Sequence, residues 1–229
     1  MISDPNRGSV LLIAKRMDHL LDQIVFLGGC AAGLLITDSA AAPMRVTDDV
    51  DVIAEIGSYS EYADFGHQLR GLGFVEDTTG AVICRWIVEG TYVDIMPTGA
   101  GVLGFSNRWY EGAMKTATLF ALEGIQIRLI AAPYFLATKL DAFAGRGEND
   151  FRSSQDLEDI IAVVDGRPSL VEEIAASEYE LRLFLSKSIG SLLQTSAFVE
   201  ALPGYLPPDA ASQARLDLVM SRLRTIASI

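Results

Sequence analysis

Short runs of apolar residues predict strands in the first part of the chain. Ile24–Leu27 is continuously apolar and rich in β-branched residues, which indicates a buried strand. Val50–Ala54 is predicted to form a second strand. Apolar runs on either side of a glycine turn predict two hairpins, Ile83–Glu89 with Tyr92–Met96 and Leu119–Leu122 with Ile125–Ile130.

Helical periodicity marks the segments between and after these strands. Ser58 followed by Glu61 is a capping-box pattern and predicts where one helix begins. The helices expected in the first part are Ser9–Gln23, Cys30–Ile36, Ser58–Gly73 and Asn107–Lys115, the last capped by Ser106. The later ones are Pro133–Gly145, Gln155–Val164, Glu172–Leu193 and Pro208–Ile226.

This order of elements predicts an α+β fold, with a small mixed β-sheet flanked by helices and a helical C-terminal lobe behind it. The composition changes near Ala131, where strand patterns stop. We therefore expect a catalytic α/β lobe at 1–130 and a helical lobe at 131–229.

Composition narrows the class of protein. Half of the 229 residues are hydrophobic and 21% are charged, as in globular proteins with a substantial core. The two cysteines lie in apolar surroundings, and with no signal-peptide pattern this predicts a cytoplasmic protein without a disulfide framework. The longest apolar run, Val25–Ile36, is too short to span a bilayer, so no membrane partner is expected. A net charge of −12 argues against broad nucleic-acid binding.

Candidate chemistry begins where the first strand ends. Gly28 and Gly29 allow a tight turn that brings backbone N–H groups close to a ligand, and the N-terminus of the following helix suits a phosphate. Asp49 and Asp51 alternate with valines, so both carboxylates lie on one strand face. A hard divalent cation would relieve their repulsion. Taken alone, Asp48, Asp49 and Asp51 are better explained as solvent-facing residues on an edge strand.

A third aspartate strengthens the metal-site interpretation. Asp94 lies between Val93 and Ile95 in a predicted strand, where aspartate is rare. If its hairpin lies beside the Val50–Ala54 strand, three carboxylates converge and can hold two metal ions.

These residues resemble the signature of the nucleotidyltransferase superfamily typified by DNA polymerase beta. The matching residues are Gly28-Gly29, Thr47-Asp48-Asp49-Val50-Asp51-Val52 and Val93-Asp94-Ile95. The pattern Arg-x-Thr-x-Asp-x-Asp from Arg45, with Lys139 and Asp156 further on, resembles the AbiEii-type branch, which includes toxins of toxin–antitoxin pairs. One departure is the long segment from Cys30 to Asp48, whose stretch Ser39–Pro43 is expected to be a loop insertion.

The resemblance implies an enzyme that transfers a nucleoside monophosphate from a nucleoside triphosphate such as ATP, with Mg²⁺ or Mn²⁺. Asp49, Asp51 and Asp94 are then the catalytic and metal-binding residues. The nucleotide-binding residues are Gly28, Gly29, Thr47, Lys139 and Asp156. The acceptor is RNA, protein or a small molecule, and a cognate antitoxin is a further possible partner.

Other interpretations stay open at this point. An antibiotic-type nucleotidyltransferase would act on a small hydroxylated or aminated molecule, and the acidic chain favours a cationic one. A degenerate domain would bind a nucleotide without turnover. Lys139 is also explained as a surface lysine whose stem packs on an apolar helix, and Asp156 as a charge that complements a helix N-terminus.

Overall fold

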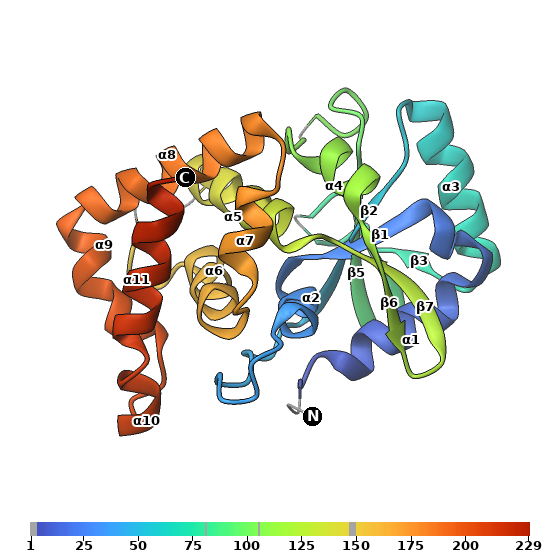
Figure 1. The fold of residues 1–229 in the computed structure, drawn as a ribbon. Coiled ribbons are helices and arrows are strands. Elements are labelled where there is room, and N and C mark those ends of the chain that lie inside the picture. The colour runs from blue at the N-terminus through green and yellow to red at the C-terminus, as the bar shows by residue number, and fades with distance from the viewer. Residues whose placement is uncertain (1–3, 81, 105, 147–149) are drawn as a thin grey trace. The chain divides into compact units, whose positions relative to one another are not determined.

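The computed structural model describes residues 4–80, 82–104, 106–146 and 150–229 (Figure 1). Within these residues the strands form one seven-stranded sheet in the order β3-β4-β5-β2-β1-β7-β6. The strands are β1 Ile24–Leu27, β2 Asp49–Ala54, β3 Val75–Glu76, β4 Arg85–Val88, β5 Thr91–Pro97, β6 Thr118–Leu122 and β7 Ile125–Leu129.

The sheet is mixed, as predicted. Strand β2 pairs antiparallel with β1 and parallel with β5, while β1 also pairs parallel with β7. The remaining pairs, β3–β4, β4–β5 and β6–β7, are antiparallel. Strand β1 is buried along its whole length, which agrees with its unbroken apolar sequence. The predicted α+β class is therefore confirmed.

Both predicted hairpins form, and each turns through two residues with positive φ. The β4–β5 turn has Glu89 at φ 49° and Gly90 at φ 79°. The β6–β7 turn repeats this with Glu123 at 48° and Gly124 at 88°. Positive φ at both central residues matches the twist of the flanking strands. These turns fix the register of each hairpin.

The helices near the sheet are α1 Arg7–Met17, α3 Tyr59–Gly71 and α4 Tyr110–Thr116, with a 3₁₀ segment η1 at Asp18–Gln23. The predicted capping box of α3 is present, since Ser58 and Glu61 bond each other's backbone N–H groups. The single helix expected over Ser9–Gln23 is wrong, because Asp18 takes φ 45° and the chain continues as η1.

The expected cap Ser106 is also wrong. Helix α4 begins later, at Tyr110. Asn107 makes the preceding turn, in which its side chain accepts a hydrogen bond from the N–H of Trp109 and its carbonyl accepts one from Tyr110. An asparagine side chain that bonds the backbone two residues ahead is a common turn device. The turn therefore takes the place of a serine cap.

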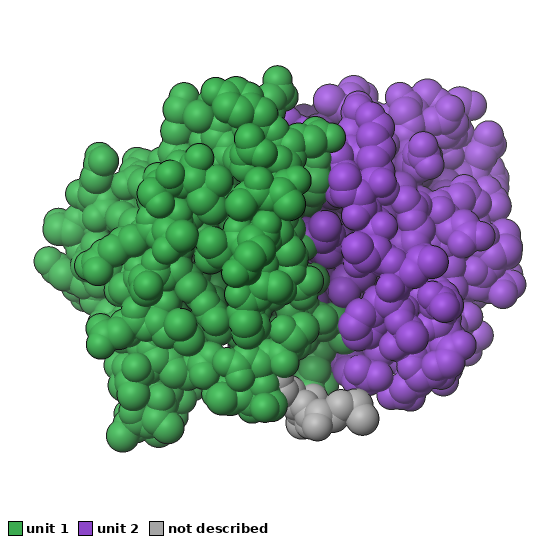
Figure 2. Space-filling view, viewed as in Figure 1, with its two compact units in different colours: residues 1–4, 32–44, 132–229 green, residues 5–31, 45–131 purple. Residues whose placement is uncertain are grey.

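The chain divides into two compact units, coloured separately in Figure 2. Unit 2 comprises residues 5–31 and 45–131 and contains the sheet. Unit 1 comprises residues 1–4, 32–44 and 132–229 and is helical. Helix α2, Gly28–Leu35, contributes its first residues to unit 2 and its last residues to unit 1. The predicted boundary near residue 130 placed residues 32–44 in the lobe with the sheet, whereas they belong to the helical unit.

Buried backbone contacts explain why residues 32–44 belong to the helical unit. The N–H groups of Thr37 and Asp38 both donate to the carbonyl of Gly166 at 2.9 Å. Arg167 donates to the carbonyl of Leu35 at 2.8 Å. A Cβ at Gly166 would lie 2.7 Å from Ile36, so glycine permits this close approach. The predicted loop at Ser39–Pro43 is an irregular segment beyond these contacts.

The helices of unit 1 after residue 131 are α5 Ala132–Arg146, α6 Gln155–Gly166, α7 Leu170–Ala175, α8 Tyr179–Gln194, α9 Ser196–Ala201, η2 Leu202–Tyr205, α10 Ala210–Gln213 and α11 Leu216–Ala227. Helices α5, α6, α8 and α11 pack on one another (Figure 1). Apolar residues at helical spacing, such as Leu181, Leu185 and Ile189 of α8, are fully buried there. No helix among the described residues is long and apolar enough to cross a membrane.

Two long helices expected in this unit are interrupted. The segment Glu172–Leu193 splits into α7 and α8, because Ser177 and Arg182 bond carbonyl groups at the end of α7. The segment Pro208–Ile226 splits into α10, which Asp209 caps, and α11. Helix α9 and the η2 turn were not predicted. In each case polar side chains satisfy the free backbone groups at a helix end.

Candidate functional site

The register of the sheet places three carboxylates on one face. Strand β5 runs parallel to β2, with Asp94 paired to Asp51 and Tyr92 paired to Asp49. Paired residues project to the same side of a sheet, and so do residues two apart on one strand. Asp49, Asp51 and Asp94 therefore share a face, which is the convergence expected from the sequence. Their proposed roles in catalysis and metal binding stay predictions.

Arg85, which the sequence analysis missed, joins two of these aspartates. It pairs with Asp94 across the β4–β5 ladder. Its Nε and Nη2 donate to the two carboxylate oxygens of Asp94 at 2.7 and 2.8 Å, and Nη2 also donates to Oδ2 of Asp49 at 2.6 Å. Its guanidinium carbon lies 5.0 Å from the centre of the Tyr92 ring. The structure has a two-residue turn at Glu89-Gly90, and this turn places Arg85 opposite Asp94.

The carboxylates govern the ionisation of their neighbours. The hydrogen bond from Arg85 to Asp94 raises the pKa of the guanidinium further above its ordinary value. Burial, followed by the charges of Asp94 and Asp51, raises the pKa of the Cys84 thiol to about 12. Cys84 is thus a neutral, buried thiol at pH 7. This agrees with the prediction that it packs and does not react.

Gly28, in the turn from β1 into α2, lies against the carboxylate of Asp51. It has φ +70°, which disfavours any residue with a side chain, and it is the first residue of α2. A Cβ placed on it would lie 1.8 Å from Oδ2 of Asp51. The Asp51 carboxylate therefore fills the space that a side chain would need. Gly29 follows it within the first turn of α2.

Thr47 lies just before β2 and supports the backbone of the aspartate strand. Its hydroxyl donates to the carbonyl of Asp49 at 3.2 Å. Its backbone N–H donates to the Asn6 side chain at 2.9 Å, and Asn6 in turn donates to the carbonyl of Arg45. Asn6 is buried and was not singled out from the sequence. The hydroxyl of Thr47 thus contacts backbone, and its predicted contact with nucleotide stays a prediction.

Lys139 and Asp156 lie in unit 1, where they pair with each other and with Asp159. The Lys139 ammonium is 3.2 Å from Asp156 Oδ1 and 2.7 Å from Asp159 Oδ2. The side chain of Lys139 is 11% exposed and that of Asp159 is fully buried. Asp159 was not predicted, although it lies one helical turn after Asp156 on α6. The simple surface-lysine alternative for Lys139 is therefore wrong.

The candidate site offers the donor chemistry of a divalent-cation site. Three carboxylates share a face, and glycine leaves room for one of them at Asp51. Oxygen donors of this kind suit Mg²⁺ or Mn²⁺. Among the described residues, however, no three His, Cys, Asp or Glu side chains are gathered closely enough to hold a metal ion as they stand. The cation that Asp49 and Asp94 contact in the structure is the Arg85 guanidinium.

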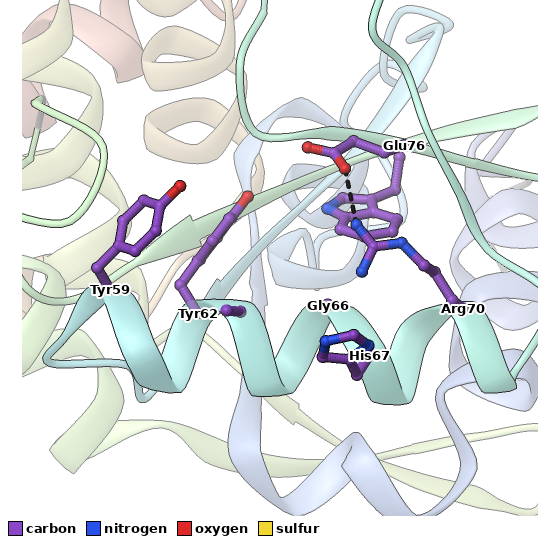
Figure 3. Close-up of a pocket in the computed structure, with 8 residues that line it drawn as sticks. Tyr59, Tyr62, Gly66, His67, Arg70 and Glu76 are labelled. Atoms are coloured by element: carbon purple, nitrogen blue, oxygen red, sulfur yellow. Dashed lines mark hydrogen bonds and ion pairs between the residues drawn. The ribbon is translucent and has the colours of Figure 1, made fainter.

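A pocket of about 300 Å³ lies on the face of β4 opposite to Arg85. Trp86 follows Arg85 on β4 and therefore projects away from the carboxylates. Figure 3 shows Tyr59 and Tyr62 rising from α3, with Arg70 further along the same helix and next to Glu76. Arg70 pairs with Glu76 at 2.9 Å and lies over the Trp86 ring, 5.2 Å from its centre. The pocket is thus separate from the three aspartates.

No protein-family model matches the chain, and no curated protein matches its sequence. A solved structure that is similar is the crystal structure of an antigenic nucleotidyltransferase-like protein from Paracoccidioides brasiliensis. Its TM-score is 0.50 at 19% identity, over 88% of this chain and 94% of that one. This likeness shows that the fold is nucleotidyltransferase-like.

Two further solved structures show weaker similarity. For the antibiotic-resistance factor ANT(2'')-Ia the TM-score is 0.46 at 13% identity, over 82% of this chain and 94% of that one. For JHP933 from Helicobacter pylori the TM-score is 0.47 at 13% identity, over 100% of this chain and 92% of that one. The AbiEii-type branch stays a prediction.

Proposed function

We propose that the protein is a metal-dependent nucleotidyltransferase that moves a nucleoside monophosphate from a nucleoside triphosphate to an acceptor. The observation that carries this proposal is the convergence of Asp49, Asp51 and Asp94 on one sheet face, beside the Gly28 turn. The nucleotidyltransferase-like fold supports it independently. Three neighbouring carboxylates need positive charge close by. Arg85 supplies it to Asp49 and Asp94, and the proposed divalent cation would supply it to all three.

Asp49, Asp51 and Asp94 would hold Mg²⁺ or Mn²⁺, which supplies charge neutralisation for the attacking and leaving oxygens when bound. In the proposed reaction a hydroxyl oxygen of the acceptor forms a bond to the α-phosphorus of the nucleotide. The bond from that phosphorus to the bridging oxygen breaks, and pyrophosphate leaves. Asp94 is the proposed base for the proton of the attacking hydroxyl. Positioning and charge supply most of the catalysis in such transfers.

The nucleotide is assigned to residues around this face and in the helical unit. Gly28 and Gly29 present backbone N–H groups at the start of α2, where an anion is favoured. Thr47 lies beside the aspartate strand. For Lys139 and Asp156 the assignment rests on family resemblance, and any nucleotide contact would have to draw on an ammonium that two carboxylates already hold.

The acceptor is proposed to be cationic, because the chain carries a net charge of −12. Such a chain attracts positive groups and repels the phosphates of nucleic acids. An aminated small molecule or a basic protein fits this field better than RNA. A toxin role would show separately, as growth arrest on expression that a neighbouring gene product relieves.

The decisive experiment compares Asp49→Asn with Asp48→Asn. Each purified protein is incubated with α-phosphate-labelled nucleoside triphosphates, Mg²⁺ and either basic proteins, aminated small molecules or RNA. We expect label transfer by the parent protein, and a loss of about a hundredfold or more in Asp49→Asn, since metal binding contributes several kcal/mol and each 1.4 kcal/mol is tenfold.

Asp48→Asn is the matched control, because it makes the same chemical change at an exposed neighbour. It should leave transfer unchanged. Full transfer by Asp49→Asn would falsify the assignment of the site. Nucleotide-dependent thermal stabilisation without any transfer would instead favour the non-catalytic binding module.

A further inference from the structure

Arg85 already uses the carboxylate oxygens that a divalent cation would need. Both oxygens of Asp94 and Oδ2 of Asp49 accept hydrogen bonds from its guanidinium. The Arg85 side chain is 20% exposed, compared with 33% for Asp49 and 10% for Asp94. The pair of Arg85 with Asp49 is therefore partly open to solvent, whereas Asp94 is buried behind it.

We propose that Arg85 is a built-in counter-cation, which holds Asp49 and Asp94 in the metal-free protein and exchanges them for nucleotide phosphate when a divalent cation binds. This inference rests on the proposed nucleotidyl transfer and deepens it by naming a positioning residue.

Electrostatics favour the exchange. A guanidinium and a divalent cation that share carboxylate oxygens lie only a few ångströms apart and repel each other. We therefore expect the hold of Arg85 on at least one carboxylate to weaken when the cation arrives. Without Arg85, Asp49 and Asp94 would repel each other across neighbouring strands in the metal-free protein.

Phosphate is the natural new partner for the released side chain. The planar guanidinium fork matches phosphate oxygens as well as carboxylate oxygens. The Tyr92 ring lies on the same face and contacts the guanidinium, so it can keep the side chain near the site during the exchange. The positive charge of Arg85 thus pairs with carboxylates before the nucleotide binds and with phosphate afterwards.

Manganese binding tests this inference directly, with a readout other than activity. The affinity for Mn²⁺ is measured by electron paramagnetic resonance of the free ion, first without nucleotide, for the parent protein, Arg85→Met and Arg85→Lys. We expect Arg85→Met to bind Mn²⁺ about tenfold more tightly or better, because a competing set of charge-assisted hydrogen bonds is gone. Arg85→Lys keeps the charge but loses the fork, so its affinity should fall between the two.

Arg70→Met is the matched control. Arg70 also pairs with a carboxylate and lies over an aromatic ring, but on the opposite face of β4 (Figure 3). The substitution removes the same charge from the protein and should leave Mn²⁺ affinity unchanged. Tighter binding in Arg85→Met alone would therefore show local competition and not a general gain of negative charge.

The second arm adds a non-hydrolysable ATP analogue. The advantage of Arg85→Met should shrink, since the parent Arg85 then gains phosphate contacts that methionine lacks. An advantage that stays tenfold would overturn the exchange onto phosphate. Folded Arg85→Met that binds Mn²⁺ no more tightly than the parent would overturn the counter-cation role. If Arg85→Met does not fold, Arg85→Lys takes its place. Mn²⁺ affinity in Arg85→Lys that is no tighter than in the parent would then overturn the counter-cation role.

Asp49→Asn separates this inference from the proposed function. It should weaken Mn²⁺ binding both alone and together with Arg85→Met, because it removes a proposed ligand. If Mn²⁺ binds equally well with and without Asp49, the proposed metal site is wrong and the Arg85 inference falls with it. If Asp49→Asn weakens binding but Arg85→Met has no effect, only the Arg85 inference is overturned.

Discussion

Two clusters in this protein have the same ionic make-up but different surroundings. In unit 2, Arg85 lies between Asp49 and Asp94 on one face of the sheet, where Asp49 and Arg85 are partly exposed and Asp94 is buried. In unit 1, Lys139 lies between Asp156 and Asp159, and all three side chains are nearly or fully buried. The Arg85 cluster is therefore partly exposed to solvent, whereas the Lys139 cluster lies within the helical core.

The difference in burial decides what each cluster can do. A buried ion pair whose partner is removed leaves an uncompensated charge in a medium of low dielectric, which is strongly destabilising. An ion pair at the edge of solvent loses much less, because water replaces the missing partner. The Arg85 cluster can therefore exchange partners, whereas the Lys139 cluster is better suited to holding α5 and α6 together.

Lys139→Met gives the largest expected effect and tests this contrast first. The substitution keeps the length of the side chain but removes the ammonium between two buried carboxylates. We expect the free energy of unfolding in urea to fall by about 3–5 kcal/mol. Arg85→Met, measured in the same way, should lose clearly less.

Lys139→Arg is the control, since it keeps the charge and should recover part of the stability. The comparison also tests the predicted nucleotide contact of Lys139. An unchanged stability with a raised KM for the nucleoside triphosphate would show that Lys139 serves the substrate and that the two clusters do not differ as argued.

Gly28→Ala should have the next largest effect, this time on the sheet face that carries Asp49, Asp51 and Asp94. An alanine at φ +70° costs about 1–2 kcal/mol, and its Cβ would lie on Oδ2 of Asp51. We expect this stability loss together with weaker Mn²⁺ binding and slower nucleotidyl transfer, because Asp51 must move. Urea unfolding and a Mn²⁺ titration measure the two effects.

Gly73→Ala separates the two causes. Gly73 has φ +89°, and nothing lies within 4 Å of a Cβ placed on it. It should show a similar stability cost with unchanged Mn²⁺ affinity. Equal metal affinities in the two variants would mean that the close approach of Gly28 to Asp51 has no functional role.

The strands that carry Asp49 and Asp94 were predictable from the sequence because their signals are local, although Arg85 itself was missed. The apolar run before Gly28 and the turn at Glu89-Gly90 fixed β1 and the β4–β5 hairpin. Counting back from that turn places Arg85 opposite Asp94. Only the parallel pairing of β2 with β5, which brings in Asp49, needed an assumption about residues distant in the chain.

The helical unit was harder to predict because its contacts join distant segments. Thr37 and Asp38 bond the carbonyl of Gly166, so residues 32–44 pack with helices that follow much later in the chain. No local periodicity signals such a partner. The same holds for Asp159, whose side chain looks like a solvated helix charge until α5 supplies Lys139.

A third cluster of the same make-up sharpens the comparison and carries the smallest expected effect. Arg215 lies 2.7 Å from both Asp38 and Asp165 in unit 1. The Asp38 side chain is 24% exposed, which lies between 33% for Asp49 in the Arg85 cluster and 8% for Asp156 in the Lys139 cluster. Asp38→Asn should cost less than about 1 kcal/mol at pH 7, which is the range of solvent-accessible pairs.

The pH dependence of this loss identifies its cause. The hydrogen bond from the Ala40 N–H, and after it that from Arg215, lowers the pKa of Asp38 below its ordinary value. A carboxylate whose pKa is lower in the folded state stabilises the protein above its unfolded pKa, which is about 3.9. The difference in urea stability between parent and Asp38→Asn should therefore vanish as pH falls through the lowered value. A stability difference that persists in acid would show that Asp38 acts by packing. The order of stability losses among the three clusters would then follow from burial alone and not from charge.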